Sequence, residues 1–445
     1  MHVFSLARRK GVRAAALAAL LALPAALAGC GDFLEVENPG FIEEPKLSDS
    51  TYIPLMVNGV IGEYQATQSV YAYRTAVFTD ELRNHFGAAG GEEYLFDQRR
   101  VTPDNGTHSF FLYAPMQRTR FLADSVASRL RGLLADSAGR DRRLARVQAY
   151  SGHSYLILAE GLCNSPIDVS APLPPDSLFN RAIVRFDDAI RIATAAKAVA
   201  GAPAAVTLSA DSIINFARVG AARAYLNMGN MAKALELARP VPAAFEFRAS
   251  YSKNSTRETS EFFRRMVTPA WASLSNTPFE AIKNDPRVPR PATLSPVQGG
   301  SGFVPRPPSS FSGYTATLTG GEWTEGGTVR IASGLEARYI VAEAEGVNAA
   351  NLLFVNQRRA IGEQVALPAG TTEAEYQAAL RDQRRRDFYL DGHRLGDLRR
   401  YLRLYNVNDF PTGSYLGSTT LNYGDQTCLP LNLAEIDNNP NVPKS

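Results

Sequence analysis

The side chains best suited to bind a ligand gather in two stretches of the chain that are rich in loop-forming residues. The first stretch supplies an aromatic ring, a guanidinium, an amide and an imidazole, and the second supplies three aromatic rings. These residues are Tyr73, Arg83, Asn84 and His85 in the first stretch and Trp271, Tyr314 and Trp323 in the second. A flat ring packs against the apolar face of a sugar while polar groups bond its hydroxyls. The pattern predicts a site for a small neutral ligand.

Trp323 is the aromatic residue with the least local bulk around it, because glycines flank it on both sides. An exposed indole is therefore one prediction for this position. A Trp packed into a core is the alternative, since Trp side chains are usually largely buried.

The sequence contains none of the common catalytic or metal-binding signatures. The five histidines are scattered, and there is no HExxH pair, no Walker loop and no G-x-S-x-G elbow. Asp187 and Asp188 are adjacent carboxylates, but they lie between Arg185 and Arg191 on a predicted helix, where an ion-paired face is expected. A glycosidase pair, with carboxylates about 5 to 9.5 Å apart, need not be adjacent in sequence, yet nothing selects one. We predict no enzymatic activity, no metal site and no cofactor.

The N-terminal residues resemble a bacterial lipoprotein signal. Four cations, from Arg8 to Arg13, precede an Ala/Leu run that ends in LAGC at residues 27–30. The run is shorter than the stretch of about 20 residues that spans a bilayer, and the small residues before Cys30 suit peptidase cleavage. Residues 1–29 are the predicted signal peptide and Cys30 is the predicted lipidation site. An ordinary secretory peptide that happens to contain a cysteine is the alternative.

The charge balance gives no support to a nucleic-acid-binding surface. The chain has 47 basic and 44 acidic residues. The predicted signal holds four of the basic residues and no acidic one, which leaves 43 basic and 44 acidic residues. Nucleic acid binding needs a concentrated positive surface, so no nucleic-acid partner is expected. No later segment has 18 consecutive apolar residues, so we expect membrane attachment through the lipid alone.

Two cysteines, Cys163 and Cys428, remain once Cys30 is assigned to the lipid. Two thiols in an oxidising envelope suggest a pair, and we predict that they form a disulfide. Two separately buried thiols are the alternative, because free Cys is among the most buried residue types.

Helical periodicity and turn residues divide the mature chain into segments. Residues 30–45 are predicted to be an extended tether, and residues 46–445 are predicted to form a single domain. Within it we expect a helix at 47–65, a loop-rich region at 69–105, a long helix at 109–134 and an irregular cap at 250–330.

Helix hairpins are predicted at residues 140–239 and 334–361. Small residues such as Gly152 and Ala222, near large ones such as Phe186 and Tyr225, let antiparallel helices approach closely while the large residues fill the gaps. This arrangement resembles the tetratricopeptide pattern of stacked helix pairs. The predicted fold class is mainly α, with a tetratricopeptide-like scaffold, long irregular loops and a few short strands. A coincidental all-helical arrangement is the alternative.

Four motifs, taken together, resemble those of the RagB/SusD family. Residues 384–400 read RRRDFYLDGHRLGDLRR and residues 429–440 read LPLNLAEIDNNP. Nearer the N-terminus, residues 78–81 read FTDE, and residues 342–344 read AEA. The resemblance covers essentially the whole chain, and its order is more specific than any single motif. Asp391 stands where the family commonly has Glu, and residues 431–433 depart from its usual run, which puts subfamily in doubt more than family.

The resemblance implies a SusD-like, outer-membrane lipoprotein that is surface-exposed and not an enzyme. Such a protein would capture a nutrient, most often an oligosaccharide, and deliver it to a SusC-like TonB-dependent transporter. The resemblance also implies that the two loop stretches meet on one surface. The alternative function is a scaffold or assembly lipoprotein whose hairpins bind other envelope proteins without a small ligand.

The Arg-rich segment, residues 384–400, is predicted to be architectural. Gly392 permits a left-handed turn, and Asp387, Asp391 and Asp397 can pair with neighbouring guanidiniums. Because acids are interleaved with the arginines, we expect the segment to be largely self-neutralised rather than an anionic-ligand site.

Overall fold

The computed structural model describes residues 44–84, 91–267, 271–274, 276–288, 326–415 and 418–444. The chain divides into two units, residues 1–52 and residues 53–445. The described part of the first unit consists of two short 3-10 turns, Glu44–Ser48 and Ser50–Tyr52. Within the described residues, no helix combines the length and apolar character that crossing a membrane requires.

The described part of the second unit is mainly helical, with four short strands, and it confirms the predicted fold class. Its longer helices are α2 (Ile53–Phe78), α5 (Ala114–Leu134), α6 (Arg142–Gly161), α7 (Pro175–Lys197), α8 (Ala204–Asn227), α9 (Met231–Ala238), α10 (Gly334–Glu345), α11 (Ala349–Ile361), α12 (Glu373–Asp387) and α13 (Arg394–Tyr405). Three short helices are α3 (Glu92–Asp97), α4 (Gly106–His108) and α14 (Leu433–Asn438). The strands form two antiparallel pairs, β1 (Arg83–Asn84) with β3 (Ala272–Ser273) and β2 (Glu246–Ser250) with β4 (Thr328–Ser333).

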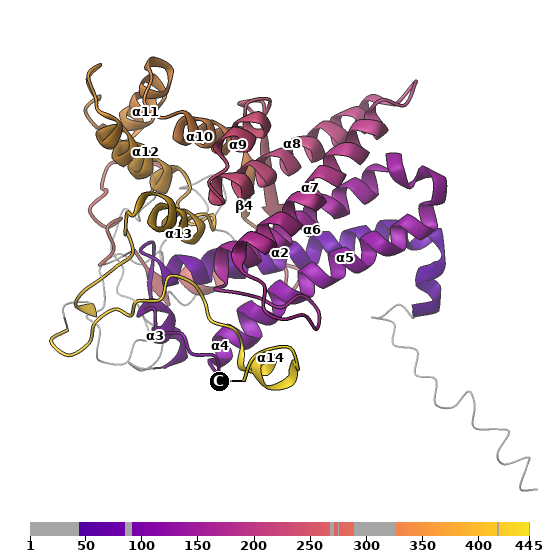
Figure 1. The fold of residues 1–445 in the computed structure, drawn as a ribbon, viewed down its shortest axis with the longest axis horizontal. Helices are drawn as coiled ribbons and strands as arrows, with labels where there is room; N and C mark the ends of the chain where they lie inside the picture. Colours follow the sequence, from indigo (N-terminus) through magenta and orange to yellow (C-terminus); the bar gives the residue numbers. More distant parts are fainter. Residues whose placement is uncertain are drawn as a thin grey trace, which may run out of the picture. The chain divides into compact units, whose positions relative to one another are not determined.

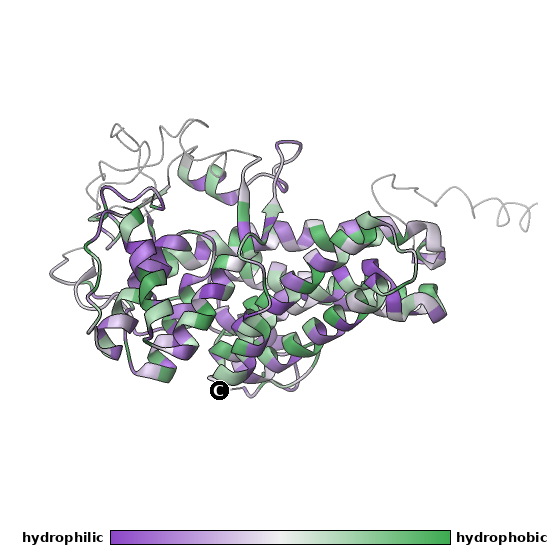
Figure 2. Cartoon of the chain, turned by 90° about the horizontal axis from the view of Figure 1, so that it is seen from above, coloured by the Kyte–Doolittle hydropathy of each residue, from purple (hydrophilic) through white to green (hydrophobic). Residues whose placement is uncertain are grey.

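Helices α5 to α8 lie side by side in sequence order (Figure 1). The predicted packing of small against large residues is present where α6, α7 and α8 meet. A Cβ on Gly152 of α6 would lie 2.5 Å from the Phe186 ring of α7, and one on Gly220 of α8 would lie 2.4 Å from the same ring. The two glycines therefore admit one buried ring between three helices. Figure 2 shows that the helices of the chain carry hydrophobic residues alongside hydrophilic ones, as amphipathic helices do.

The second predicted hairpin is formed by α10 and α11, and α12 packs against it. The three helices share a buried cluster that consists of Tyr339, Ala342, Phe354, Val355, Tyr376, Ala379, Leu380 and Phe388. The hydroxyl of Tyr376 donates to the carbonyl of Ala342 at 2.9 Å, so the buried phenol is satisfied. A capping box at Thr372 and Glu375 begins α12.

The prediction for residues 47–105 was wrong in its boundaries. The helix begins at Ile53 and continues to Phe78, through residues that were assigned to a loop-rich region. Tyr71, Ala72, Ala76 and Phe78 are all fully buried, so this half of α2 is apolar on more than one face. A helix that is surrounded by neighbours lacks the one-sided periodicity by which an amphipathic helix is recognised.

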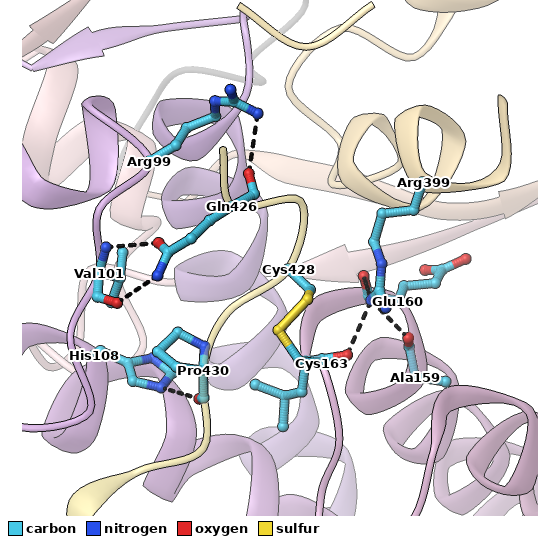
Figure 3. The surroundings of a disulfide bond; sticks show 11 residues. Arg99, Val101, His108, Ala159, Glu160, Cys163, Arg399, Gln426, Cys428 and Pro430 are labelled. Carbon is cyan, nitrogen blue, oxygen red and sulfur yellow. Dashed lines mark hydrogen bonds between the residues drawn. A yellow bond between two sulfur atoms is a disulfide. The ribbon is translucent and has the colours of Figure 1, made fainter. Parts of the chain in front are cut away.

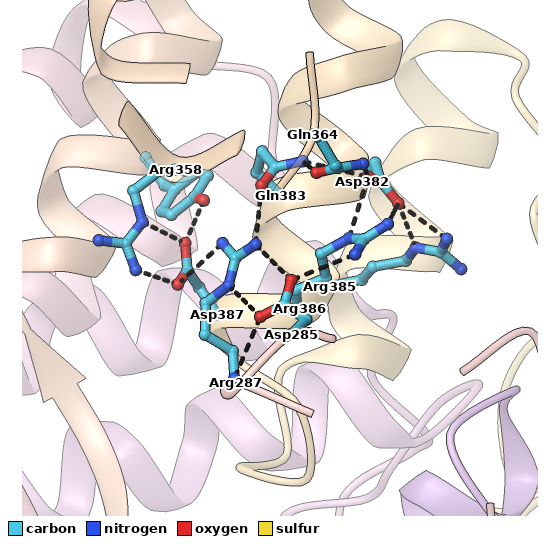
Figure 4. Close-up of polar contacts among 10 residues, drawn as sticks. Asp285, Arg287, Arg358, Gln364, Asp382, Gln383, Arg385, Arg386 and Asp387 are labelled. Atoms are coloured by element: carbon cyan, nitrogen blue, oxygen red, sulfur yellow. Dashed lines mark hydrogen bonds and ion pairs between the residues drawn. The ribbon is translucent and has the colours of Figure 1, made fainter. Parts of the chain in front are cut away.

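The Arg-rich segment, residues 384–400, is ion-paired, as predicted, but it is not self-neutralised. Most of the carboxylates that pair with its arginines lie outside it, and they are Asp80, Asp285, Glu343 and Asp382. It ends α12, turns through Gly392 with φ of +87°, and begins α13. Asp397 accepts from Arg384 at 2.7 Å and lies 2.8 Å from Arg400. Around Asp387 and Asp285, which Figure 4 draws, carboxylates and guanidiniums alternate in the same way. The buried arginines of the segment, Arg384, Arg394 and Arg400, each pair with a carboxylate, so losing one partner would leave a buried charge unpaired.

The FTDE motif, residues 78–81, contacts the Arg-rich segment although some 310 residues of sequence separate them. Both carboxylate oxygens of Asp80 accept from Arg394, at 2.7 and 2.8 Å. The side chain of Glu81 accepts from the backbone N–H of Leu390 at 2.9 Å. The FTDE motif and the Arg-rich segment, which were recognised separately in the sequence, therefore bind each other in the folded protein.

His393 is expected to make stability fall as the pH rises above neutrality. Its Nδ1 lies 2.6 Å from Asp391 and its Nε2 lies 3.2 Å from Glu336. Burial acts to lower the pKa of His393, but these two carboxylates outweigh it and raise the pKa to about 9. Because the folded state binds this proton more tightly than the unfolded state, the protonated imidazole contributes its full stabilisation below pH 6.5. This stabilisation is lost as the pH rises through about 9.

Urea unfolding measured between pH 6 and 9.5 checks this expectation. The wild type should lose at least about 1 kcal/mol more than His393→Gln over that interval, because one pKa unit corresponds to about 1.4 kcal/mol. Burial also raises the pKa of Glu81 to about 8, so the difference between the two proteins, not the wild-type slope, reports His393. Parallel pH profiles would show that the imidazolium is not stabilising.

A disulfide joins Cys163, after the end of α6, to Cys428 in the C-terminal tail (Figure 3). Backbone hydrogen bonds beside the disulfide also join the C-terminal tail to the end of α6. Cys163 donates its N–H to the carbonyl of Leu429 at 2.9 Å, and Leu429 donates to Gly161 at 2.9 Å. A ring nitrogen of His108 lies 2.9 Å from the carbonyl oxygen of Pro430. The LPLNLAEIDNNP motif therefore begins where the tail is tied to α6.

Candidate functional site

The two loop stretches that carry the predicted ligand-binding residues meet at the pairing of β1 with β3. Arg83 lies opposite Ser273, and Asn84 lies opposite Ala272, which follows Trp271. The described ends of the two stretches are thus neighbours, as the family resemblance implied. This pairing fixes the position of Arg83 for the site described below.

Three of the predicted ligand contacts are core residues. The exposed fractions of Tyr73, Arg83 and Asn84 are 1%, 2% and 1%. The ring of Tyr73 packs edge-on against Phe262, with centroids 6.1 Å apart, because α2 extends further than predicted. Tyr73 and Asn84 therefore present no surface on which a sugar could pack, and their assignment as ligand contacts was wrong.

Asp97 organises the polar residues behind β1. It accepts from Nη1 of Arg83 at 3.2 Å and from the backbone N–H of Asn84 at 2.9 Å. The hydroxyl of Tyr415 donates to it at 3.0 Å. Burial raises the pKa of Asp97, against the lowering effect of the Arg83 guanidinium. Asp97 therefore fixes the position of the Arg83 guanidinium, and Arg83 contributes to the site as a buried residue that packs beneath its surface.

A surface hollow with a volume of about 570 Å³ lies beside Asp80 and Arg83. Its other walls come from residues 276–278 and from the loop that follows α13. The residues lining it are Asp80, Arg83, Asn276, Pro278, Asn408, Asp409, Phe410, Pro411, Thr412, Ser414 and Tyr423. This size lies within the range of small-molecule sites, about 300 to 1,000 Å³.

Two aromatic residues line the hollow, the buried Phe410 and the half-buried Tyr423. The Arg83 guanidinium lies 5.3 Å from the ring centroid of Tyr423, and Tyr415 packs edge-on against this ring with centroids 5.2 Å apart. Tyr423 is half-buried, so its ring is fixed on one side and accessible on the other. An aromatic ring that is preorganised in this way can pack against a sugar at little entropic cost.

The charges next to the hollow are already paired within the protein. Asp80 is bound by Arg394, and Arg83 is bound by Asp97. The exposed side chains of Asn408, Thr412 and Ser414 add neutral hydrogen-bonding groups. This composition suits a neutral, hydroxyl-rich ligand better than an ion.

Trp271 immediately precedes β3 and does not line the hollow. It is half-buried, and the Arg265 guanidinium lies 4.6 Å from its ring centroid. Arg265 is itself held by Glu261 at 2.7 Å. One face of the indole is therefore covered by a protein cation, and its role as a ligand contact remains a prediction. His85, Tyr314, Trp323 and the lipidation residue Cys30 lie outside the described residues.

The residues that the sequence interpretation missed come mainly from the loop after α13. Asn408, Asp409 and Tyr423 were not assigned to any site. The signal for a loop was present, because Pro411 and Gly413 interrupt the helical pattern among aromatic and amide residues. Gly413 has φ of +77°, as a turn of this kind requires. Within the described residues, no group of three or more His, Cys, Asp or Glu side chains is placed to hold a metal ion.

Comparison with known proteins identifies the fold. No family model matches the chain, and no curated protein matches it either. Among solved structures, a protein described as a laminarin binding SusD-like protein is 14% identical with a TM-score of 0.61, covering 89% of this chain and 98% of its own. A SusD superfamily protein from Bacteroides thetaiotaomicron is 13% identical with a TM-score of 0.62, covering 88% and 98%. The surface glycan-binding protein A of Bacteroides fluxus is 15% identical with a TM-score of 0.57, covering 87% and 96%.

The similarity extends over most of this chain and nearly the whole of each solved structure. It confirms the SusD-like fold that the four sequence motifs indicated.

Proposed function

We propose that this chain is a non-enzymatic, cell-surface lipoprotein that captures an oligosaccharide in the hollow lined by Tyr423. The observation that carries the proposal is the accessible ring of Tyr423, fixed over a base of paired charges and surrounded by neutral polar side chains. Proteins of the same fold are described as laminarin binding, as glycan-binding and as a putative sugar binding protein. The ligand class proposed for this chain agrees with those descriptions.

The second half of the proposal concerns delivery. The bound ligand passes to a SusC-like TonB-dependent transporter in the outer membrane, to which the lipid on Cys30 keeps the protein close. Support comes from the LAGC pattern at residues 27–30 and from the SusD-like fold. An anchor raises the local concentration of the protein beside its transporter without any new contact. Copurification of a large β-barrel protein with the membrane-extracted lipoprotein tests this half. A complex without a barrel, together with no glycan binding, favours the scaffold function instead.

Removing the ring of Tyr423 is expected to weaken glycan binding about tenfold, because an aromatic contact contributes up to about 1.5 kcal/mol beyond its buried area. A panel of soluble glycans that includes laminarin oligosaccharides identifies the best ligand by calorimetry. The affinity of Tyr423→Ala for that ligand is then compared with the wild type.

Two variants control for indirect effects. Tyr423→Phe keeps the ring and should bind within about threefold of the wild type, since it loses at most one hydrogen bond. Phe121→Ala removes an exposed ring from α5, which does not line the hollow, and should leave binding unchanged. Equal affinities for Tyr423→Ala and the wild type would show that the ligand binds at another surface.

A further inference from the structure

Arg399 on α13 differs from the other arginines of the Arg-rich segment, residues 384–400, in its charge partner. Each other arginine of that segment lies within ion-pair distance of a carboxylate. Within the part of the chain that the structure describes, no carboxylate lies within 4.0 Å of Arg399. Its Nη1 donates instead to three carbonyl oxygens at the end of α6, those of Ala159 at 2.9 Å, Glu160 at 2.7 Å and Leu162 at 3.0 Å (Figure 3).

The opposite edge of the Arg399 guanidinium, formed by Nε and Nη2, donates no hydrogen bond to any of the described residues. Elsewhere this chain uses the same edge to bind carboxylates with two parallel hydrogen bonds. Arg394 binds Asp80 in this way at 2.7 and 2.8 Å, and Arg400 binds Glu343 at 2.8 and 2.9 Å. The fork geometry of this edge matches the two oxygens of a carboxylate.

Arg399 lines a cavity of about 370 Å³ at the junction of α6, α7, α8 and α13. Arg399 is half-buried, and neither Nε nor Nη2 is sealed from solvent. Burial lowers the pKa of Arg399 to about 10, which leaves the guanidinium charged at neutral pH. A cation in this position is only partly hydrated and has an unfilled, directional pair of donors.

The other charged residues of the cavity wall are Glu160, Arg400 and Arg403, and each has an opposite charge within ion-pair distance. Oε1 of Glu160 accepts from Asn227 at 2.9 Å and lies 3.6 Å from Arg223, whereas its Oε2 accepts no hydrogen bond among the described residues. Arg403 is bound by Asp176 at 2.6 Å. The negative charge of Glu160 is thus shared with Arg223, and it does not occupy the free edge of Arg399. The ring of Phe179 and Pro175 supply an apolar wall.

We propose that this cavity binds a carboxylate-bearing sugar, a uronic acid residue, through a bidentate contact with Nε and Nη2 of Arg399. The apolar wall at Phe179 and Pro175 faces the sugar ring, and the volume is larger than a bare anion needs. The site uses none of the residues of the Tyr423 hollow, so it stands or fails independently of the neutral-glycan site.

Calorimetric titration of the purified protein with sodium D-glucuronate, D-glucose and sodium sulfate tests the proposal. Glucuronate is expected to bind at least about tenfold more tightly than glucose, because only the acid fills the free edge of Arg399. Arg399→Lys keeps the positive charge but has no planar fork, so it should lose about tenfold in glucuronate affinity. The glucuronate affinity of the wild type should also fall as NaCl is added.

Two further variants separate ligand contact from folding. Thr427 lines the cavity, so Thr427→Trp fills the space without changing Arg399 and should also abolish glucuronate binding. Arg191→Gln alters an exposed arginine that pairs with Asp188 and should bind like the wild type. If circular dichroism shows that Arg399→Lys does not fold, the glucuronate affinity of Thr427→Trp tests the proposal instead. Unchanged binding in Thr427→Trp, or sulfate binding as tight as glucuronate, overturns the proposal.

Discussion

Replacing Asp80 with alanine is expected to lower the free energy of unfolding by about 3 to 5 kcal/mol, the cost of leaving one member of a buried ion pair without its partner. Arg394 binds both carboxylate oxygens of Asp80, and the two side chains are 5% and 4% exposed. Without Asp80, the guanidinium keeps its charge in a site that water barely reaches. Urea denaturation followed by circular dichroism measures the change.

A surface ion pair provides the matched control for Asp80→Ala. Lys197 and Asp211 lie 2.6 Å apart, but their side chains are 44% and 42% exposed. Asp211→Ala should therefore cost about 1 kcal/mol or less. The double variant Asp80→Ala/Arg394→Met should be less destabilised than the sum of its single variants, because it removes the orphaned charge. A loss below about 1 kcal/mol in Asp80→Ala would contradict the structural role given to the FTDE motif.

The helical scaffold could be predicted from sequence because its signals are local. In α6, α7 and α8, small and large residues recur at helical spacing. Gly152 and Phe186, which were among them, do pack together, and the structure adds Gly220 to this contact. The same reasoning failed for the second half of α2. That half is enclosed by other elements, so its aromatic residues follow no one-sided pattern and resemble a binding loop instead.

The candidate site was harder to predict because its parts are distant in sequence. Arg83 was predicted as a ligand contact, and only the structure shows that it is buried, that Asp97 binds it and that it lies against the Tyr423 ring. Tyr423 follows Arg83 by some 340 residues and lies in a loop without periodicity. Such contacts depend on the tertiary fold, so composition alone cannot distinguish a buried Tyr73 from an accessible Tyr423.

The prediction for the Arg-rich segment shows the same limit on a smaller scale. Interleaved acids correctly indicated ion pairing, and Asp397 with Arg384 illustrates it. Sequence spacing could not show which arginine would lack a carboxylate. Arg399 faces the end of α6, where carbonyl oxygens take the place of an acid. The segment has six arginines and three aspartates, and Arg399 is the arginine that finds no carboxylate among the described residues.

Removing the disulfide is expected to destabilise the protein by about 4 to 5 kcal/mol in the chain-entropy model, because the bond closes a very long loop. Cys163 and Cys428 are 265 positions apart. In the unfolded chain the bond restricts most of the second unit, whereas in the folded chain the tail is already positioned by the backbone bonds of Leu429. The stabilisation therefore acts mainly through the unfolded state.

Urea unfolding of the wild type and of Cys163→Ala/Cys428→Ala, each with and without dithiothreitol, measures this contribution. The reductant should lower the wild-type free energy of unfolding to that of the variant and should leave the variant unchanged. Both half-cystines are half-buried, so the reductant reaches them once the tail opens. The tail bonds, including Gln426 to the carbonyl of Val101 at 2.8 Å, should keep the variant folded with the same helical signal. A difference below about 1 kcal/mol would mean that the tail contacts already restrict the unfolded chain as much as the disulfide does.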